Sequence, residues 1–342
     1  MIRSRLAFAS VFVIAMLVWS PQIGAQNDNQ KQAKRAERAK KAAGLPQVIF
    51  DESVNPSTAD LTYGIGGKEH SPDLTGIFTF LQEDMEQSQP KFDVKDAQGN
   101  TWRIKLGEEV KSETAATHLV WAMGYYVDTD YYAEQLKVEG LTKLRRGEKL
   151  VEDGGVVRSV RLELKSKEVK KLGTWSWYDN PFVGTKEFNG LRVMMALINN
   201  WDSTSINNSI YEVDGQRRYA VTDLGASFGK TGDSISRSKS NMEDYVKSKF
   251  IEKTTPEYVD FVLHSRPFLP TIVNVPNYIH RTKVTDVATH IPRADAKWIG
   301  QRLAQLSDQQ IRDCFQSAGY SPEQVEGYSK ALEKRIAELN AL

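Results

Sequence analysis

Cysteine and histidine are scarce in this 342-residue sequence, which contains one cysteine, Cys314, and five histidines. A single cysteine excludes an intramolecular disulfide and any cysteine-rich zinc site. Because Cys314 lies in a helical pattern, we expect a buried structural thiol and not a nucleophile. His264, His280 and His290 are too widely spaced along the chain to predict a metal site. The sequence alone therefore predicts neither a disulfide nor a zinc site.

Excess charge is also lacking, since 45 lysines and arginines face 44 aspartates and glutamates. A net charge of +1 gives no electrostatic support for nucleic-acid binding, and we expect no nucleic-acid partner. What the chain does have is apolar content, because 40% of its residues are hydrophobic. A chain of this length and composition can bury a substantial core and suits one two-lobed domain or two small domains.

The N-terminus has the pattern of a secretory signal peptide over residues 1–25. Arg3 and Arg5 precede an apolar run from Leu6 to Trp19, and small residues before Gln26 offer a cleavage site. The run is short for a transmembrane helix, although an uncleaved anchor is an alternative. We therefore expect an exported protein, periplasmic or extracellular, with no integral membrane span after signal cleavage.

A basic polar segment follows at residues 26–44. Its lysines and arginines have almost no apolar residues between them, which is typical of a solvated chain. We expect a tether that is at most transiently helical, and folded sequence that begins near Leu45.

Glycines are dense at Gly64, Gly66 and Gly67, ahead of an apolar run at residues 77–81. Glycines in such a place let backbone amides approach an anionic ligand. An ordinary loop is the alternative, because glycine clusters mark turns in general. We take the three glycines as candidate cofactor-binding residues.

A hairpin is predicted immediately after this segment. Residues 91–94 and 102–106 read as strands, and the turn-forming residues 96–100 separate them. Within the second strand, Lys105 lies on the face opposite the apolar side chains.

A helix over residues 113–123 follows, with Ser112 as its expected N-cap. Glu113 begins the inward, otherwise apolar stripe of this helix. An acid on a buried face requires a cation, and Lys105 is the nearest candidate. In the alternative, Glu113 favours the helix N-terminus through the helix dipole while Lys105 is solvated, or Glu109 is the partner of Lys105.

The middle of the chain leads towards a group of acidic residues. Residues 156–164 alternate as a strand, and residues 175–182 form an aromatic-rich connection. Thr185 is expected to cap a helix over residues 186–199, which delivers the chain directly to Asp202.

The most informative pattern consists of Asp202, Asn207 and Asp223 around a short hairpin. Strands predicted at residues 209–213 and 218–222 flank an Asp-Gly turn, so Asp202 and Asp223 fall at the two open ends of one hairpin. This is the layout of a phosphoryl-transfer site, with a base, an amide metal ligand and an acidic metal ligand. Turn chemistry explains the same residue types without catalysis, and the neighbouring Asn208 is an alternative ligand to Asn207.

In serial order, a strand lysine, a helix glutamate, D-x-x-x-x-N and a hairpin into Asp-Leu-Gly resemble the protein-kinase-like fold. The segments LINNWD and TDLGASFG look most like the atypical secretory-pathway kinases, the related spore-coat kinases and the phosphoinositide-kinase-like enzymes. The resemblance runs from Tyr63 to Gly229. It implies a two-lobed α+β fold, with a strand-rich N-lobe and interlobe connection over residues 45–180 and a mainly helical C-lobe over residues 181–342.

The resemblance also implies a role for each residue. Lys105 and Glu113 would be the phosphate-positioning pair, Asp202 the catalytic base, and Asn207 and Asp223 the magnesium ligands. The implied function is an ATP- and Mg²⁺-dependent phosphotransferase that acts on a protein, lipid or small-molecule hydroxyl. Two alternatives stay open: a catalytically inactive kinase-like binding module of the cell envelope, and transfer of AMP on the same fold.

The C-terminal third offers fewer signals of chemistry. Residues 230–241 suit a mobile loop over a site, in which Arg237 and Lys239 would meet an anionic substrate or lie on a solvated surface. We expect the remainder to be helical, with helices that open at capping boxes on Ser307 and Ser321.

The N-terminal pattern makes a direct prediction about processing. Protein recovered from the envelope or the medium is expected to begin at or near Gln26, because the small residues before it suit signal cleavage. N-terminal sequencing checks this expectation. An intact Met1 terminus in a cytoplasmic fraction would contradict export.

Overall fold

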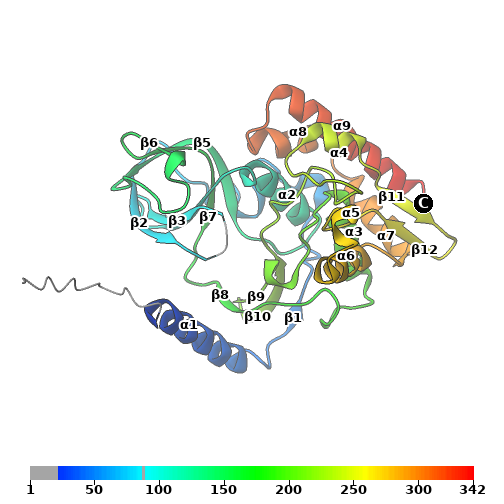
Figure 1. Cartoon of the computed structure of the whole chain (residues 1–342), viewed down its shortest axis with the longest axis horizontal. Helices are drawn as coiled ribbons and strands as arrows, with labels where there is room; N and C mark the ends of the chain where they lie inside the picture. Colours follow the sequence, from blue (N-terminus) through cyan, green and yellow to red (C-terminus); the bar gives the residue numbers. More distant parts are fainter. Residues whose placement is uncertain (1–21, 87–88) are drawn as a thin grey trace, which may run out of the picture.

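The computed structural model describes residues 22–86 and 89–342, so most of the expected signal peptide lies outside the described residues. The chain forms two lobes of mixed α+β structure, with curved sheets on the left of Figure 1 and helices on the right. The expected two-lobed α+β fold is confirmed. None of the helices in the described part combines the length and the apolar content that a membrane span requires.

The N-lobe is a strongly curved sheet whose strands close on themselves. Each of the following strands pairs with the next, and the last returns to the first: β2 (Phe78–Asp84), β3 (Lys91–Lys95), β4 (Thr101–Leu106), β7 (Val156–Leu164) and β5 (Asp130–Glu139). A short strand, β6 (Val151–Glu152), pairs antiparallel with the beginning of β7. Alternate residues of β4, namely Trp102, Ile104 and Leu106, are buried inside this closed sheet. Lys105 therefore lies on its outer face.

Helix α2 (Val110–Ala122) packs on that outer face and also contacts α8 (Asp308–Ser317) of the other lobe. The Cys314 thiol of α8 is buried and donates a hydrogen bond to the Ala115 carbonyl at 3.2 Å. The helix begins before the expected position, so the prediction of Ser112 as N-cap is wrong. Ser112 lies inside the first turn and its hydroxyl donates to the Gly225 carbonyl at 2.7 Å. Long-range contact thus determines its role, which a local capping pattern does not reveal.

A second sheet lies below α2 in Figure 1 and has the order β1-β10-β9-β8. Its strands are β1 (Gln47–Val48), β8 (Lys170–Gly173), β9 (Asn208–Val213) and β10 (Gln216–Val221). Antiparallel pairing of β9 with β10 confirms the predicted hairpin around Asp214. The chain after β10 reaches the first sheet through the contact between Asp223 and Lys105 of β4.

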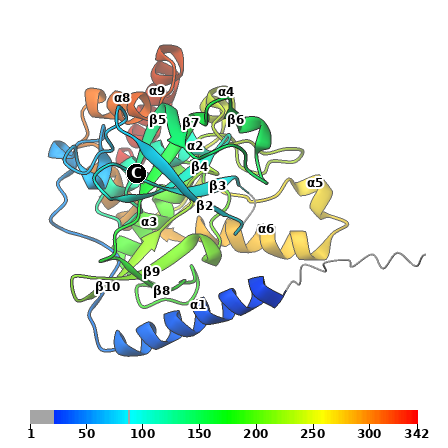
Figure 2. The same ribbon diagram turned by 90° about the vertical axis from the view of Figure 1, so that its left-hand side faces the viewer.

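Helix α1 (Gln22–Lys41) packs along β8, beneath the second sheet (Figures 1 and 2). The segment expected to be a solvated tether is thus helical as far as Lys41, and most of its side chains from residue 30 onwards are exposed. Lys31 Nζ donates to Glu86 Oε1 at 2.8 Å, so the helix is attached to the N-lobe by a polar contact. A segment with so few apolar residues is ordered here by its neighbours and not by its own pattern.

The C-lobe is built from helices around one large core. These are α3 (Lys186–Leu197), α4 (Met242–Lys247), α5 (Phe268–Thr271), α6 (Val275–Val287), α7 (Arg293–Leu303), α8 and α9 (Pro322–Asn340). Thr185 caps α3, and capping boxes on Ser307 and Ser321 open α8 and α9, as predicted. Phe228, just after the Asp-Leu-Gly segment, stacks edge-on against Phe315 at 5.1 Å between ring centroids. The acidic motif is therefore anchored in the C-lobe core.

The C-terminal third is not wholly helical, which corrects our expectation. It contains a small sheet of β11 (Ile251–Thr254), β12 (Tyr258–Phe261) and β13 (Ile291–Pro292). Val259 and Phe261, which are two residues apart on β12, both lie in the core, as expected for one face of a strand. Single 3₁₀ turns complete the fold: η1 (Pro56–Thr58), η2 (Gly64–Gly66), η3 (Glu148–Leu150) and η4 (Ser205–Asn207).

Candidate functional site

Lys105 lies at the centre of the site. Its Nζ donates to Glu113 Oε2 and to Asp223 Oδ1, each at 2.7 Å, and lies 2.9 Å from Glu109 Oε2. The side chain is only 5% exposed. Burial alone would lower the pKa of Lys105, but the charges of Glu113, Asp223 and Glu109 raise it above its usual value. Lys105 is therefore a fixed positive charge that three segments of the chain share.

Lys105 is the middle member of a row of cations across the first sheet. Lys91 of β3 and Arg161 of β7 are its cross-strand partners, and we call these three residues the cation row. Like charges directly opposite each other are destabilising unless acids separate them. Glu113 serves this purpose, because its second oxygen lies 3.5 Å from Arg161 Nη1, and Asp130 accepts from Arg161 Nε at 2.6 Å.

Asp223 follows β10 with a left-handed backbone, at a φ of 56°. This conformation is uncommon for residues other than glycine and costs on the order of 1 kcal/mol. The hydrogen bond from Ser112 to the Gly225 carbonyl helps to hold the turn. A Cβ at Gly225 would lie 2.6 Å from Glu109 Cβ, so only glycine allows this approach to α2. Burial would raise the pKa of Asp223, but Lys105 lowers it below its usual value and keeps the carboxylate ionised.

Asp202 and Asn207 lie together before β9, the first strand of the same hairpin. Asn207 Nδ2 donates to the Asp202 carbonyl at 2.9 Å and to Asp202 Oδ2 at 3.1 Å. The Thr222 amide, one residue before Asp223, donates to the Asn207 carbonyl at 2.9 Å. Burial raises the pKa of Asp202, and the hydrogen bond from Asn207 opposes this effect. The structure thus brings all three acidic-motif residues to one end of the hairpin.

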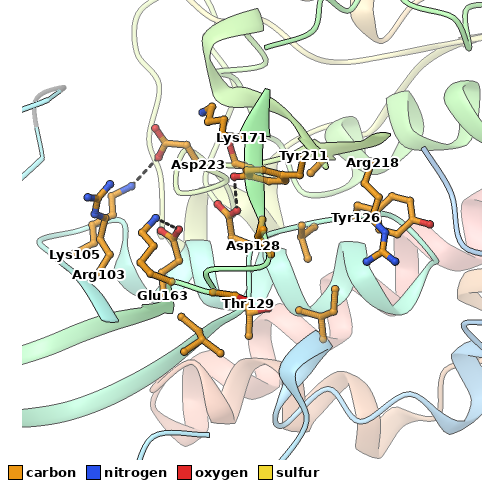
Figure 3. Close-up of a pocket in the computed structure, with 18 of the residues that line it drawn as sticks. Arg103, Lys105, Tyr126, Asp128, Thr129, Glu163, Lys171, Tyr211, Arg218 and Asp223 are labelled. Atoms are coloured by element: carbon orange, nitrogen blue, oxygen red, sulfur yellow. Dashed lines mark hydrogen bonds and ion pairs between the residues drawn. The ribbon is translucent and has the colours of Figure 1, made fainter. Parts of the chain in front are cut away.

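A cavity of about 500 Å³ opens beside Lys105 and Asp223 (Figure 3). The outer face of the first sheet, the connection after β7, and β9 with β10 form its walls. Its far side is polar: the Tyr211 hydroxyl donates to Asp128 Oδ1 at 2.9 Å, and Lys165 pairs with Glu163. Its volume lies in the usual range of small-ligand sites. Asp202 and Asn207 do not line this cavity, so it provides one side of the site and they provide the other.

The three predicted glycines lie elsewhere. A Cβ at Gly64 would lie 2.4 Å from His118 Cδ2, and a Cβ at Gly66 would lie 2.0 Å from the Tyr131 hydroxyl. These glycines therefore allow the 3₁₀ turn to pack closely on α2 and β5. Together with Gly67 they do not line the cavity, although Ile65 between them does.

The segment between β2 and β3 reaches the cavity instead. Glu86 and Lys91, at the two ends of this connection, both line the cavity. The sequence from residue 85 to 90 contains no glycine, so a search for glycine clusters could not find it. Only the pairing of β2 with β3 in the structure shows that the ends of this connection lie at the cavity.

Sequence reasoning also missed Arg161. This arginine alternates with the buried Val160 and Leu162, just as Lys105 alternates with Ile104 and Leu106. A basic residue between apolar neighbours in two strands is the available signal. The strand pairing that sets Arg161 opposite Lys105 is not visible in the sequence.

Oxygen donors near Lys105 suit a magnesium ion. Asp223 Oδ2 and Asn207 Oδ1 make no hydrogen bond with any other residue that the structure describes. A carboxylate and an amide oxygen are ligands that Mg²⁺ accepts, with water and phosphate oxygens completing its shell. The residues present therefore fit the metal that the sequence pattern implies.

Comparison with known proteins gives likeness in fold only. No protein-family model and no curated protein matches the sequence. The chain resembles protein-kinase-like structures, among them a Helicobacter pylori proinflammatory kinase, CtkA, at 12% identity and a TM-score of 0.45, over 78% of this chain and 96% of that chain. It also resembles the Golgi casein kinase at 10% identity and a TM-score of 0.39, over 98% and 94% of the two chains. The same kinase with Mn/ADP bound gives a TM-score of 0.38 at 10% identity, over 98% and 93%.

The buried charges around Arg161 generate a stability prediction. Arg161→Met is expected to lower the free energy of unfolding by about 3–5 kcal/mol, because it leaves Glu113 and Asp130 buried without their cation. Urea unfolding measures the change. The matched control is Arg158→Met on the same strand, since Arg158 pairs with Glu152 in a half-exposed bridge and its loss is expected to change the free energy of unfolding little. Equal effects of the two substitutions would contradict the buried network.

Proposed function

We propose that this protein is an exported, ATP- and Mg²⁺-dependent phosphotransferase that acts on a hydroxyl-bearing acceptor. One observation carries the proposal: Lys105 contacts Glu113 and Asp223 at 2.7 Å beside a cavity of small-ligand size. The carbonyl of Asn207 accepts a hydrogen bond from the amide of Thr222, the residue before Asp223. In protein kinases, a strand lysine paired with a helix glutamate, next to a metal-binding aspartate, positions the nucleotide for phosphoryl transfer.

Each residue has a distinct task in this proposal. Asp223 and Asn207 would hold the magnesium ion through their unpaired oxygens. The bound magnesium–nucleotide would supply the transferable phosphoryl group. Lys105 would donate to phosphate oxygens from the wall of the cavity, and Glu113 keeps its amine in place. Positive charge aimed at the transferring group is the largest contribution that such a site makes to catalysis.

Asp202 would accept the proton of the acceptor hydroxyl. Its carboxylate is held by Asn207 at 3.1 Å, which orients one oxygen and leaves the other for the acceptor. Partial burial raises the pKa of Asp202, which makes the carboxylate a better base than an exposed aspartate. Because Asp202 lies outside the cavity, the acceptor would approach from the C-lobe side of Asp223.

A catalytically inactive binding module is the second candidate. The observation that favours it is the connection between β2 and β3, which lacks glycine where protein kinases cover the phosphates with a glycine-rich loop. In that case the charges around Lys105 would have a structural or nucleotide-sensing role without turnover.

Two conservative substitutions separate these candidates. Asp223→Asn is expected to abolish both Mg²⁺-dependent stabilisation by ATP and turnover, because the metal loses its charged ligand. Asp202→Asn is expected to retain the ATP-dependent thermal shift and to lower turnover by about two to four orders of magnitude, the range for loss of a general base. Thermal unfolding with and without Mg²⁺–ATP, together with release of ADP, measures both effects.

The control for these variants is Asp214→Asn at the turn of the same hairpin. Asp214 has a φ of 50°, close to that of Asp223, and its side chain is exposed. The substitution is expected to change neither binding nor turnover. ATP binding without any turnover in the wild-type protein would favour the binding module. No thermal shift with any nucleoside triphosphate would contradict the phosphotransferase and favour a binding module in which the charges around Lys105 have a structural role.

A further inference from the structure

Helices α5 and α6 carry an exposed apolar surface on the C-lobe. Six of its side chains are between 49% and 89% exposed, and we call them the apolar ridge: Leu269, Ile272, Val273, Val275, Tyr278 and Ile279. On α6 the exposed members follow the three- and four-residue spacing of one helix face. The opposite face buries Val284 and Val287. Helix α6 is therefore apolar on both faces, which is unusual for a surface helix and marks an interaction site.

The charges within the ridge segment itself are of one sign, while Asp233 beside Arg281 and Asp286 near the end of α6 are the acidic residues close to it. The sequence from His264 to Lys283 contains no acidic residue and includes Arg266, Arg281 and Lys283. Exposed aliphatic and aromatic side chains flanked by basic residues are the pattern of a segment that lies in a membrane interface. Anionic lipid headgroups complement this charge.

A chain of contacts links the ridge to the proposed catalytic base. The Arg237 guanidinium lies 3.9 Å from the ring centroid of Trp201, the residue before Asp202. Arg237 also donates to the carbonyl of Ser265, which precedes α5. The segment that precedes α5 and the residue before Asp202 are therefore both in contact with Arg237.

Arg266 at this junction has a donor without an acceptor. Its Nε is buried and makes no hydrogen bond with the described residues. Burial lowers the pKa of His280, the charge of Arg266 lowers it further, and Asp202 acts in the opposite sense. These groups are thus close enough for their charges to interact. A buried guanidinium nitrogen without a partner among the described residues adds positive charge to this part of the C-lobe.

The position of the ridge fits a flat partner. In Figure 2, α5, α6 and the first turn of α1 all lie on the right-hand side of the molecule. A flat surface on this side would meet both helices of the ridge, α5 and α6.

We propose that the apolar ridge docks this protein on an anionic phospholipid surface, which presents the hydroxyl of a lipid headgroup to Asp202. The identity of the acceptor rests on the proposed function. Docking itself does not, because it requires neither nucleotide nor turnover.

A fluorescent label at the ridge tests docking in the full chain. Cys314 is the only cysteine and is fully buried, so Val273→Cys can be labelled selectively with an environment-sensitive dye. We expect its emission to rise and shift to the blue with vesicles that contain about one-third phosphatidylglycerol, and to change less with pure phosphatidylcholine. The control label is Ile77→Cys, which is 56% exposed on the N-lobe and is expected not to respond.

A charge substitution tests the electrostatic part of docking. Lys283→Gln in the labelled chain is expected to weaken vesicle partition by about fivefold at low salt, the contribution of one basic residue near an anionic surface. Lys137→Gln, on the exposed side of β5, is expected to leave partition unchanged. An unresponsive label at residue 273, an equal response at residue 77, or a response to protein concentration without vesicles would overturn the proposal. The last outcome would identify a second copy of the chain as the occupant. Since no nucleotide is present, none of these results depends on phosphoryl transfer.

Discussion

The buried amine of Lys105 is the interaction on which the rest of the structure depends. It joins β4 of the first sheet to Glu113 on α2 and to Asp223 at the end of the hairpin. Burying a charge is tolerated only when its partners are in place, so these elements are fixed relative to one another. Helix α2 in turn contacts α8 through the Cys314 thiol. The geometry around Lys105 is thus connected to both lobes.

Local patterns were sufficient for the elements that carry the proposed site. Period-two alternation and turn residues located β3, β4, β9 and β10, and helical spacing located α2 and α3. The pairing of Lys105 with Glu113 followed from one simple argument: an acid on an inward helix face requires a cation. The structure confirms this contact at 2.7 Å. The predicted start of the helix was nevertheless misplaced, because α2 begins before Ser112.

Features that depend on long-range contact could not be predicted. The glycines at 64, 66 and 67 belong to a tightly packed turn and do not line the cavity. Gly64 packs closely against His118 of α2, a helix that lies far along the chain from this turn. Arg161 acquires its importance from a strand register that places it opposite Lys105. Helix α1 forms on a sheet whose strands lie far along the chain. In each case the sequence shows the residue types, but it does not show which distant residue or strand they contact.

The arrangement divides the proposed site into two sides. Lys105, Asp223 and the cavity form the side suited to a nucleotide, and their charges are fixed by the cation row. Asp202 follows Trp201, whose ring contacts Arg237 of the loop at residues 230–241, and Arg237 donates to the Ser265 carbonyl ahead of α5. Substrate choice in this account is a property of the C-lobe surface, whereas phosphate positioning is a property of the contact between the lobes.

The most direct test of the central claim asks whether Lys105 meets nucleotide phosphates. An acyl-phosphate derivative of ATP transfers its acyl group to a lysine amine that lies beside the bound phosphates, and mass spectrometry locates the modified residue. We expect acylation of Lys105 that excess Mg²⁺–ATP suppresses, because Lys105 borders the cavity beside Asp223. Exposed lysines such as Lys137 are expected to react equally with and without ATP. Lys105 that stays unmodified, or whose modification ATP does not reduce, would contradict the account.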